Sequence, residues 1–148
     1  MREALRFALD FSDGTNRWSV GATDGGPAAY DHWIDALGSE ETARPFHIAY
    51  GAAIWHECRT MAEGFLAEAK DRVGTDDTRA AFEDARRHYA EVTEQLHEVT
   101  ALFPWSEHTS DQNTRDAVRR DQAIEHLRAA KAAEAVGLEA IEKLLGAL

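Results

Sequence analysis

The densest group of side chains that could do chemistry is the run Trp55-His56-Glu57-Cys58-Arg59. Cysteine, histidine and a carboxylate are the side chains of nucleophilic catalysis, in which a base removes the proton of the thiol. In a helix, however, consecutive residues point about 100° apart, so His56 cannot activate Cys58 in this way. Because Cys58 also falls on an apolar stripe, we interpret it as a small buried hydrophobic residue. We therefore predict no catalytic residue in this run.

The seven histidines are the second group of side chains that could do chemistry, because they could act as metal ligands. A metal site in a helical bundle usually shows two histidines four residues apart, or Glu-x-x-His on each of two helices. No His-x-x-x-His occurs, and the one Glu-x-x-His, Glu94 to His97, lacks a partner motif and is expected to face solvent. His47 and His56 are nine residues apart, on opposite sides of a helix. The sequence therefore predicts no metal and no cofactor.

Arg59 lies at the edge of an apolar stripe in its predicted helix, and two interpretations remain open. It could form an ion pair with Glu63, one turn later, with its alkyl stem lying on the helix surface. Alternatively, it could line a cleft as the cation that binds a carboxylate or an acidic partner.

Aromatic side chains concentrate in the N-terminal third of the chain and could complete such a cleft. Aromatic residues at helical spacing are typical of a core, but Trp and Tyr also line pockets and interfaces. On this basis six residues are candidates for binding a ligand. They are Tyr30, Trp33, Tyr50, Trp55, Glu57 and Arg59.

Helical periodicity predicts the elements that position these residues. A long helix is predicted over 45–73, beginning at a proline and stopping before Gly74. It carries one apolar stripe from Ile48 to Val73 and a second beside it. The second stripe consists of Ile54, Cys58, Met61 and Phe65. Two adjoining stripes predict a central helix that is covered on more than one side, and glycines within it suggest close helix contacts.

A second long helix is predicted by apolar residues that repeat from Phe82 to Phe103 with spacings of three and four. This pattern is typical of an antiparallel helical hairpin. The last long helix is expected from about Thr114 to the C-terminus, with an alanine-rich middle over 128–134.

Shorter helices are predicted over 2–11 and 27–37, with a short extended piece around Trp18. The expected fold is therefore all-α, a helical bundle of three long helices with two shorter N-terminal helices, forming a single domain over 1–148.

Composition narrows the function classes. There are 16 Lys and Arg residues against 27 Asp and Glu residues, a formal net charge of −11, which argues against nucleic acid or an anionic membrane as a partner. The acidic, lysine-poor composition suits either a high-salt cytoplasm or a GC-rich genome. The single cysteine excludes an internal disulfide, and with no signal peptide or long apolar run the expected location is cytoplasmic.

Several segments give a family resemblance: GPAAYDHWI at 26–34, AYGAAIWHECR at 49–59, GFL at 64–66, and the stretch from 88 to 104. Together they resemble the helical C-terminal half of papain-like proteins related to the butirosin-pathway acyltransferase. In that family the Cys–His chemistry lies in the other half, and none of its catalytic residues maps here. The resemblance implies an accessory or substrate-shaping domain rather than a catalyst.

The leading hypothesis is a non-catalytic helical domain that binds a small molecule or a protein partner near the six candidate residues. One alternative is a small helical-bundle enzyme or metalloprotein that uses His56, Glu57 or His88 with carboxylates. Another is a structural oligomerisation module that uses the repeat from Phe82 to Phe103. A homodimer is compatible with each of these, since it would cover any exposed apolar face.

Overall fold

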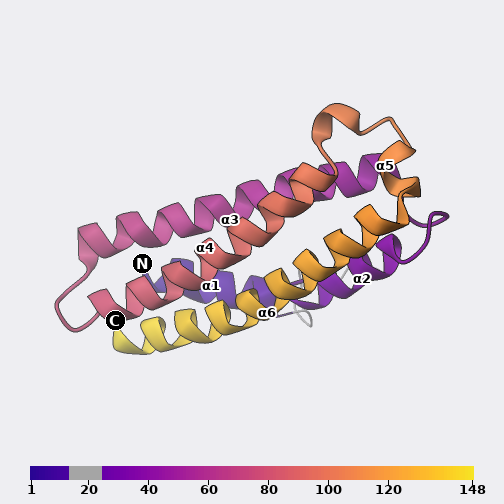
Figure 1. Ribbon diagram of the computed structural model, residues 1–148. Coiled ribbons are helices and arrows are strands. Elements are labelled where there is room, and N and C mark those ends of the chain that lie inside the picture. Colours follow the sequence, from indigo (N-terminus) through magenta and orange to yellow (C-terminus); the bar gives the residue numbers. More distant parts are fainter. Residues whose placement is uncertain (14–24) are drawn as a thin grey trace.

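The computed structural model describes residues 1–13 and 25–148, and every regular element in them is a helix. Figure 1 shows three long helices lying lengthwise, with two shorter N-terminal helices beside them. The long helices are α3 (Pro45–Val73), α4 (Arg79–Leu102) and α6 (Ala117–Ala147). The shorter elements are α1 (Arg2–Ser12), α2 (Ala28–Leu37), the 3-10 turn η1 (Trp105–Glu107) and α5 (Gln112–Arg115). The predicted all-α bundle is confirmed.

Local residues explain where α3 ends and α4 begins. Pro45 occupies the first turn of α3, where its missing N–H costs no hydrogen bond. Gly74 follows the last residue, because a Cβ there would lie 2.3 Å from the carbonyl oxygen of Lys70. In the connecting turn the Oγ1 of Thr78 accepts the backbone N–H of Thr75 at 2.9 Å. Both predicted limits of α3 are confirmed.

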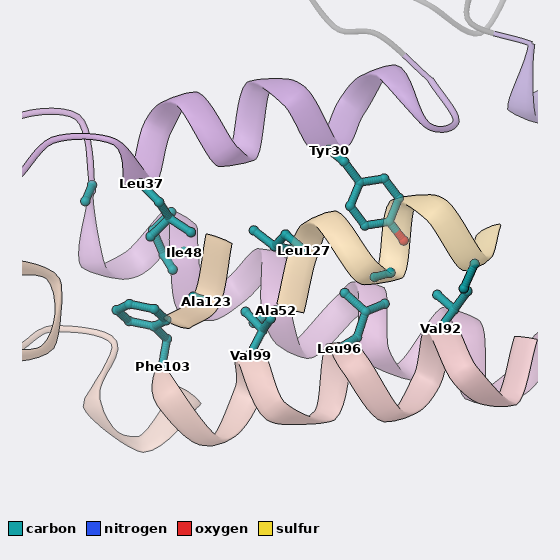
Figure 2. Close-up of a cluster of buried hydrophobic side chains, with 13 residues drawn as sticks. Tyr30, Leu37, Ile48, Ala52, Val92, Leu96, Val99, Phe103, Ala123 and Leu127 are labelled. Atoms are coloured by element: carbon teal, nitrogen blue, oxygen red, sulfur yellow. The ribbon is translucent and has the colours of Figure 1, made fainter. Parts of the chain in front are cut away.

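The apolar repeat of α4 forms the centre of the core. All seven of its residues are buried: Phe82, Ala85, Tyr89, Val92, Leu96, Val99 and Phe103. At one end of the bundle they pack with residues of α2, α3 and α6 (Figure 2), and at the other end with residues of α1, α3 and α6. Because this repeat is covered within the chain, it offers no free surface for the oligomerisation module considered above.

α4 and α6 approach each other closely because small residues line α6. Ala123, Ala130 and Ala133 are buried there. A Cβ on Gly137 would lie only 3.2 Å from the Tyr89 ring, so glycine gives this approach its room. The alanine-rich middle of α6 is therefore part of the core.

α3 is not the central helix that its two apolar stripes predict. It packs with one face against the bundle and lies at its edge in Figure 1. The second stripe is uncovered: Ile54 is 38% exposed, Met61 67% and Phe65 42%, and Cys58 is exposed too. The expectation failed because an apolar stripe at helical spacing is compatible with a free surface as well as with a core.

Smaller differences concern the remaining elements. The last helix begins at Ala117 rather than near Thr114. The carboxylate of Asp116, the residue before it, accepts hydrogen bonds from free backbone N–H groups in the first turn of the helix. The predicted close contact is present at Gly51, which faces the Trp33 ring, but absent at Gly64 within the described residues. The predicted extended piece around Trp18 lies outside the described residues. No helix within residues 1–13 and 25–148 has the length and apolar character to cross a bilayer.

Candidate functional site

A carboxylate buried in the middle of the bundle binds two of the six candidate residues. Glu134, on α6, is 1% exposed. The Tyr30 hydroxyl donates to its Oε2 at 2.6 Å, from α2. Arg59, on α3, donates from Nε to Oε2 at 3.0 Å and from Nη2 to Oε1 at 2.6 Å. Glu134, Arg59 and Tyr30 are called the buried carboxylate network below.

Glu134 was not among the candidate residues, although a signal for it exists in the sequence. Core residues of α6 recur with alternating spacings of four and three: Ala123, Leu127, Ala130, Glu134, Gly137, Ile141 and Leu144. Glu134 therefore occupies a core position of this repeat. The small residues on either side of it in the repeat, Ala130 and Gly137, make this repeat hard to recognise.

Aromatic rings enclose the guanidinium group of this network. The Arg59 Cζ lies 4.9 Å from the centre of the Trp55 ring, within the range of a cation–π interaction. The Trp55 ring in turn packs edge-on against Tyr30, with 4.9 Å between centroids, and against Trp33 at 5.7 Å. Four of the six candidate residues thus meet on the inner face of α3.

Burial and charge shift the protonation equilibria of this region. Burial, and next the negative charge of Glu134, raise the pKa of the Tyr30 phenol well above its usual value. The same two causes raise the pKa of Tyr89 to about 12. Burial alone would lower the pKa of Arg59, but the Glu134 carboxylate more than offsets this and raises it overall. Arg59 is therefore a permanent cation whose charge Glu134 neutralises.

The predicted ion pair between Arg59 and Glu63 is wrong, because the buried carboxylate is the better partner for Arg59. Glu63 instead binds Arg86 of α4 at 2.7 Å. Arg86 also binds Glu83 at 2.6 Å, and Glu83 binds Lys70 at 2.7 Å. Hydrogen bonds from Arg86 and then from Lys70 lower the pKa of Glu83 to about 2. These four side chains tie α3 to α4 at the surface.

The other two candidate residues, Tyr50 and Glu57, lie on the opposite side of α3 from the network. They belong to a stripe with spacings of four and three that is exposed along its length. Its members are Phe46, Tyr50, Ile54, Glu57, Met61 and Phe65, called the outer face of α3 below. The six candidate residues therefore do not form one site: the helix divides them between a buried network and a solvent-facing surface.

The outer face continues into an aromatic group at its N-terminal end. The Phe46 and Tyr50 rings stack with 5.7 Å between centroids, and Trp105 of η1 lies 5.7 Å from Phe46. Trp105 stacks on His108 at 4.3 Å. These contacts fold Trp105 back onto the N-terminal end of α3, although its side chain remains 46% exposed to solvent.

At its other end the outer face borders a mostly apolar hollow of about 200 Å³. Its lining consists of Met1, Phe65, Glu68, Ala69, Arg72 and Val73. Pockets that hold drug-sized molecules usually have volumes of roughly 300–1,000 Å³. The hollow is therefore better suited to one or two side chains of a partner than to a whole small molecule.

One pair of histidines lies across the junction of α3 and α4. The His56 and His97 rings are 5.4 Å apart between centroids and inclined by 47°. Burial, and next the neighbouring His97, lower the pKa of His56. Sequence spacing could not reveal this pair, because its members lie on different helices. Within the described residues no group of three or more His, Cys, Asp or Glu side chains is arranged to hold a metal ion.

Comparisons of the chain with protein-family models, with curated proteins and with solved structures found no match. The resemblance to papain-like proteins therefore stays a prediction.

Proposed function

We propose that this chain is a non-catalytic helical module that binds a partner protein through the outer face of α3. The observation that carries the proposal is the contrast between the two sides of one helix. The inner side is closed by the core, whereas the opposite side presents Phe46, Tyr50, Ile54, Met61 and Phe65 to solvent. Continuous apolar surface of this kind is typical of protein interaction sites.

The dimensions of the surface suit an extended partner. From Phe46 to Phe65 the helix rises about 30 Å at 1.5 Å per residue. Its apolar side chains recur every four residues, except that Glu57 stands between Ile54 and Met61, and this helical spacing is one that a partner helix matches along a groove or a ridge. The exposed aromatic group at one end and the hollow at the other extend the same surface.

Charge defines the chemistry of the partner. The chain carries a formal net charge of −11, and the outer face itself includes the carboxylate of Glu57. Two copies of the chain would repel each other, whereas a cationic partner would be attracted. The proposed partner is therefore an amphipathic helix with apolar residues flanked by Lys or Arg. A papain-like catalytic domain, as the resemblance implies, would have to present such a helix.

The buried carboxylate network supports binding at the outer face rather than at the inner one. Arg59 is bonded through Nε and Nη2 to both oxygens of Glu134, which is 1% exposed, so a carboxylate ligand that took over these bonds would displace Glu134 from its cation. Leaving that charge buried without a partner would be strongly unfavourable. Arg59 is therefore assigned to the structure of the bundle.

The lone Cys58 gives a direct test, since it is exposed and lies beside Ile54 and Met61 on α3. An environment-sensitive fluorophore attached to Cys58 is titrated with a basic amphipathic helical peptide. An acidic peptide with the same apolar residues serves as the comparison. We expect a saturable blue shift with the basic peptide only.

Matched variants distinguish docking on the apolar side chains from charge attraction alone. Met61→Ser combined with Phe65→Ser keeps every charge, and we expect it to weaken peptide binding by at least about tenfold. Val136→Ser on α6, where the side chain is 44% exposed, should leave binding unchanged. Equal binding by all three proteins would refute docking on the outer face. A stable dimer in sedimentation experiments without peptide would show that a second copy is the occupant.

A further inference from the structure

The junction between α3 and α4 contains two groups of facing polar side chains. One is the group of Lys70, Glu83, Arg86 and Glu63, whose charges neutralise one another. The other is the pair of His56 and His97, with one ring from each helix. In the described part of the chain, neither imidazole has a hydrogen-bond or ion-pair partner, so the nitrogens of both rings are available.

The spacing of these two rings fits a shared metal ion. A zinc–nitrogen bond is about 2.0–2.1 Å long, which places the centre of a ligating imidazole about 3 Å from the metal. Two imidazoles on one tetrahedral ion then have centres roughly 5 Å apart. The observed separation is 5.4 Å, and the rings are inclined rather than stacked. The separation of the two ring centres therefore matches that of two imidazoles on one ion.

Charge also favours metal binding. The chain carries a formal net charge of −11, which attracts divalent cations. Imidazole binds a metal through a neutral nitrogen, so protons compete with the metal.

We propose that His56 and His97 together bind one divalent cation of the transition metals that prefer imidazole, such as Zn²⁺, with water completing its coordination. Two nitrogen ligands fit zinc, copper and nickel better than magnesium or calcium, which prefer oxygen. Because one ligand comes from α3 and the other from α4, the bound ion would cross-link the two helices. It would stabilise the folded chain, since the unfolded chain does not hold the two rings together. This site is independent of the proposed binding of a partner protein.

The test uses full-length protein without a histidine tag, freed of metal with EDTA and titrated with Zn²⁺ in a calorimeter and in thermal unfolding. We expect one zinc ion per chain and a rise in Tm with zinc concentration. His56→Gln and His97→Gln should each weaken binding by at least about tenfold and remove the rise in Tm, because each leaves a single ligand. His47→Gln, at an exposed histidine elsewhere on α3, should bind zinc as the wild type does.

Failure to fold is checked by comparing the unfolding of the metal-free variants. Both histidines lie at the surface of the junction, so their metal-free Tm values should stay close to that of the wild type. The proposal is overturned if the wild type binds no zinc below about 1 mM, or if both variants bind it with unchanged affinity. It is also overturned if His47→Gln loses as much affinity as they do.

Discussion

The two sides of α3 carry similar side chains but differ in what surrounds them. The inner face places Arg59 against a buried carboxylate and Trp55 against the Tyr30 ring, whereas the outer face places Tyr50 and Met61 in solvent. The inner face of α3 thus combines buried apolar residues with one buried ion pair, whereas the outer face exposes apolar side chains on both sides of Glu57. This difference indicates that stability resides mainly on the inner side of the helix, and it is the basis of the binding proposed at the outer side.

Removal of the buried carboxylate should destabilise the inner face most. Glu134→Ala leaves Arg59 as an unpaired cation and the Tyr30 hydroxyl without its acceptor. Because the Arg59 side chain is 20% exposed, water offsets part of the penalty, and we expect a loss of about 3 kcal/mol in the free energy of unfolding. Urea denaturation measures it. A loss of less than about 1 kcal/mol in the free energy of unfolding would mean that the network does not stabilise the packing of the inner face.

Two aromatic substitutions on the same helix compare the faces directly. Trp55→Ala removes a ring that packs on Tyr30, Trp33 and Arg59, and should cost about 2 kcal/mol. Tyr50→Ala removes a half-exposed ring and should cost less than about 1 kcal/mol. Equal losses in thermal or urea unfolding would contradict the division of α3 into two faces.

Alkaline pH tests the inner face without a mutation. The folded chain keeps the protons of Tyr30 and Tyr89 above pH 10, because the pKa values of both phenols are raised, that of Tyr89 to about 12. The unfolded chain releases these protons near pH 10, so stability is fully present below that pH and falls as the pH rises. The slope for each tyrosine is up to about 1.4 kcal/mol per pH unit. Urea unfolding at pH 9–11 measures it, and Tyr89→Phe should reduce the slope.

Acidic pH should show a smaller effect at the junction of α3 and α4. The pKa of Glu83 is lowered to about 2, so its contribution is fully present above pH 4.5 and is lost as the pH falls toward 2. Because the Glu83 side chain is 46% exposed, solvent screens most of this contribution, which should be less than about 1 kcal/mol. Glu83→Gln should flatten the pH dependence of unfolding between pH 5 and 2 slightly. An effect as large as that of Glu134→Ala would contradict the assignment of stability to the inner face.

The sequence predicted the helices well because their signals are local. Pro45, Gly74 and the repeat from Phe82 to Phe103 act through neighbouring residues and regular spacing, and all were interpreted correctly. The partners of side chains are not local. Arg59 and Glu134 are 75 residues apart, and His56 and His97 lie on different helices, so neither pair could be found from spacing.

The covered side of α3 could not be predicted for a related reason. Both of its apolar stripes have the same periodicity, and the choice between them depends on where α4 and α6 pack. Recognising Glu134 as a core position of α6 would have helped, because a buried carboxylate requires a cation such as Arg59 on the facing helix.

Hydroxyl-radical footprinting of the free and peptide-bound protein tests most directly whether the outer face of α3 is the binding surface. In the free protein, Met61 and Tyr50 should oxidise readily while Tyr30 stays protected. Adding the basic amphipathic peptide should then protect Met61 and Tyr50 and leave Val118, on α6, unchanged. Protection of Met61 in the free monomer, or peptide binding that leaves Met61 and Tyr50 reactive, would contradict the account.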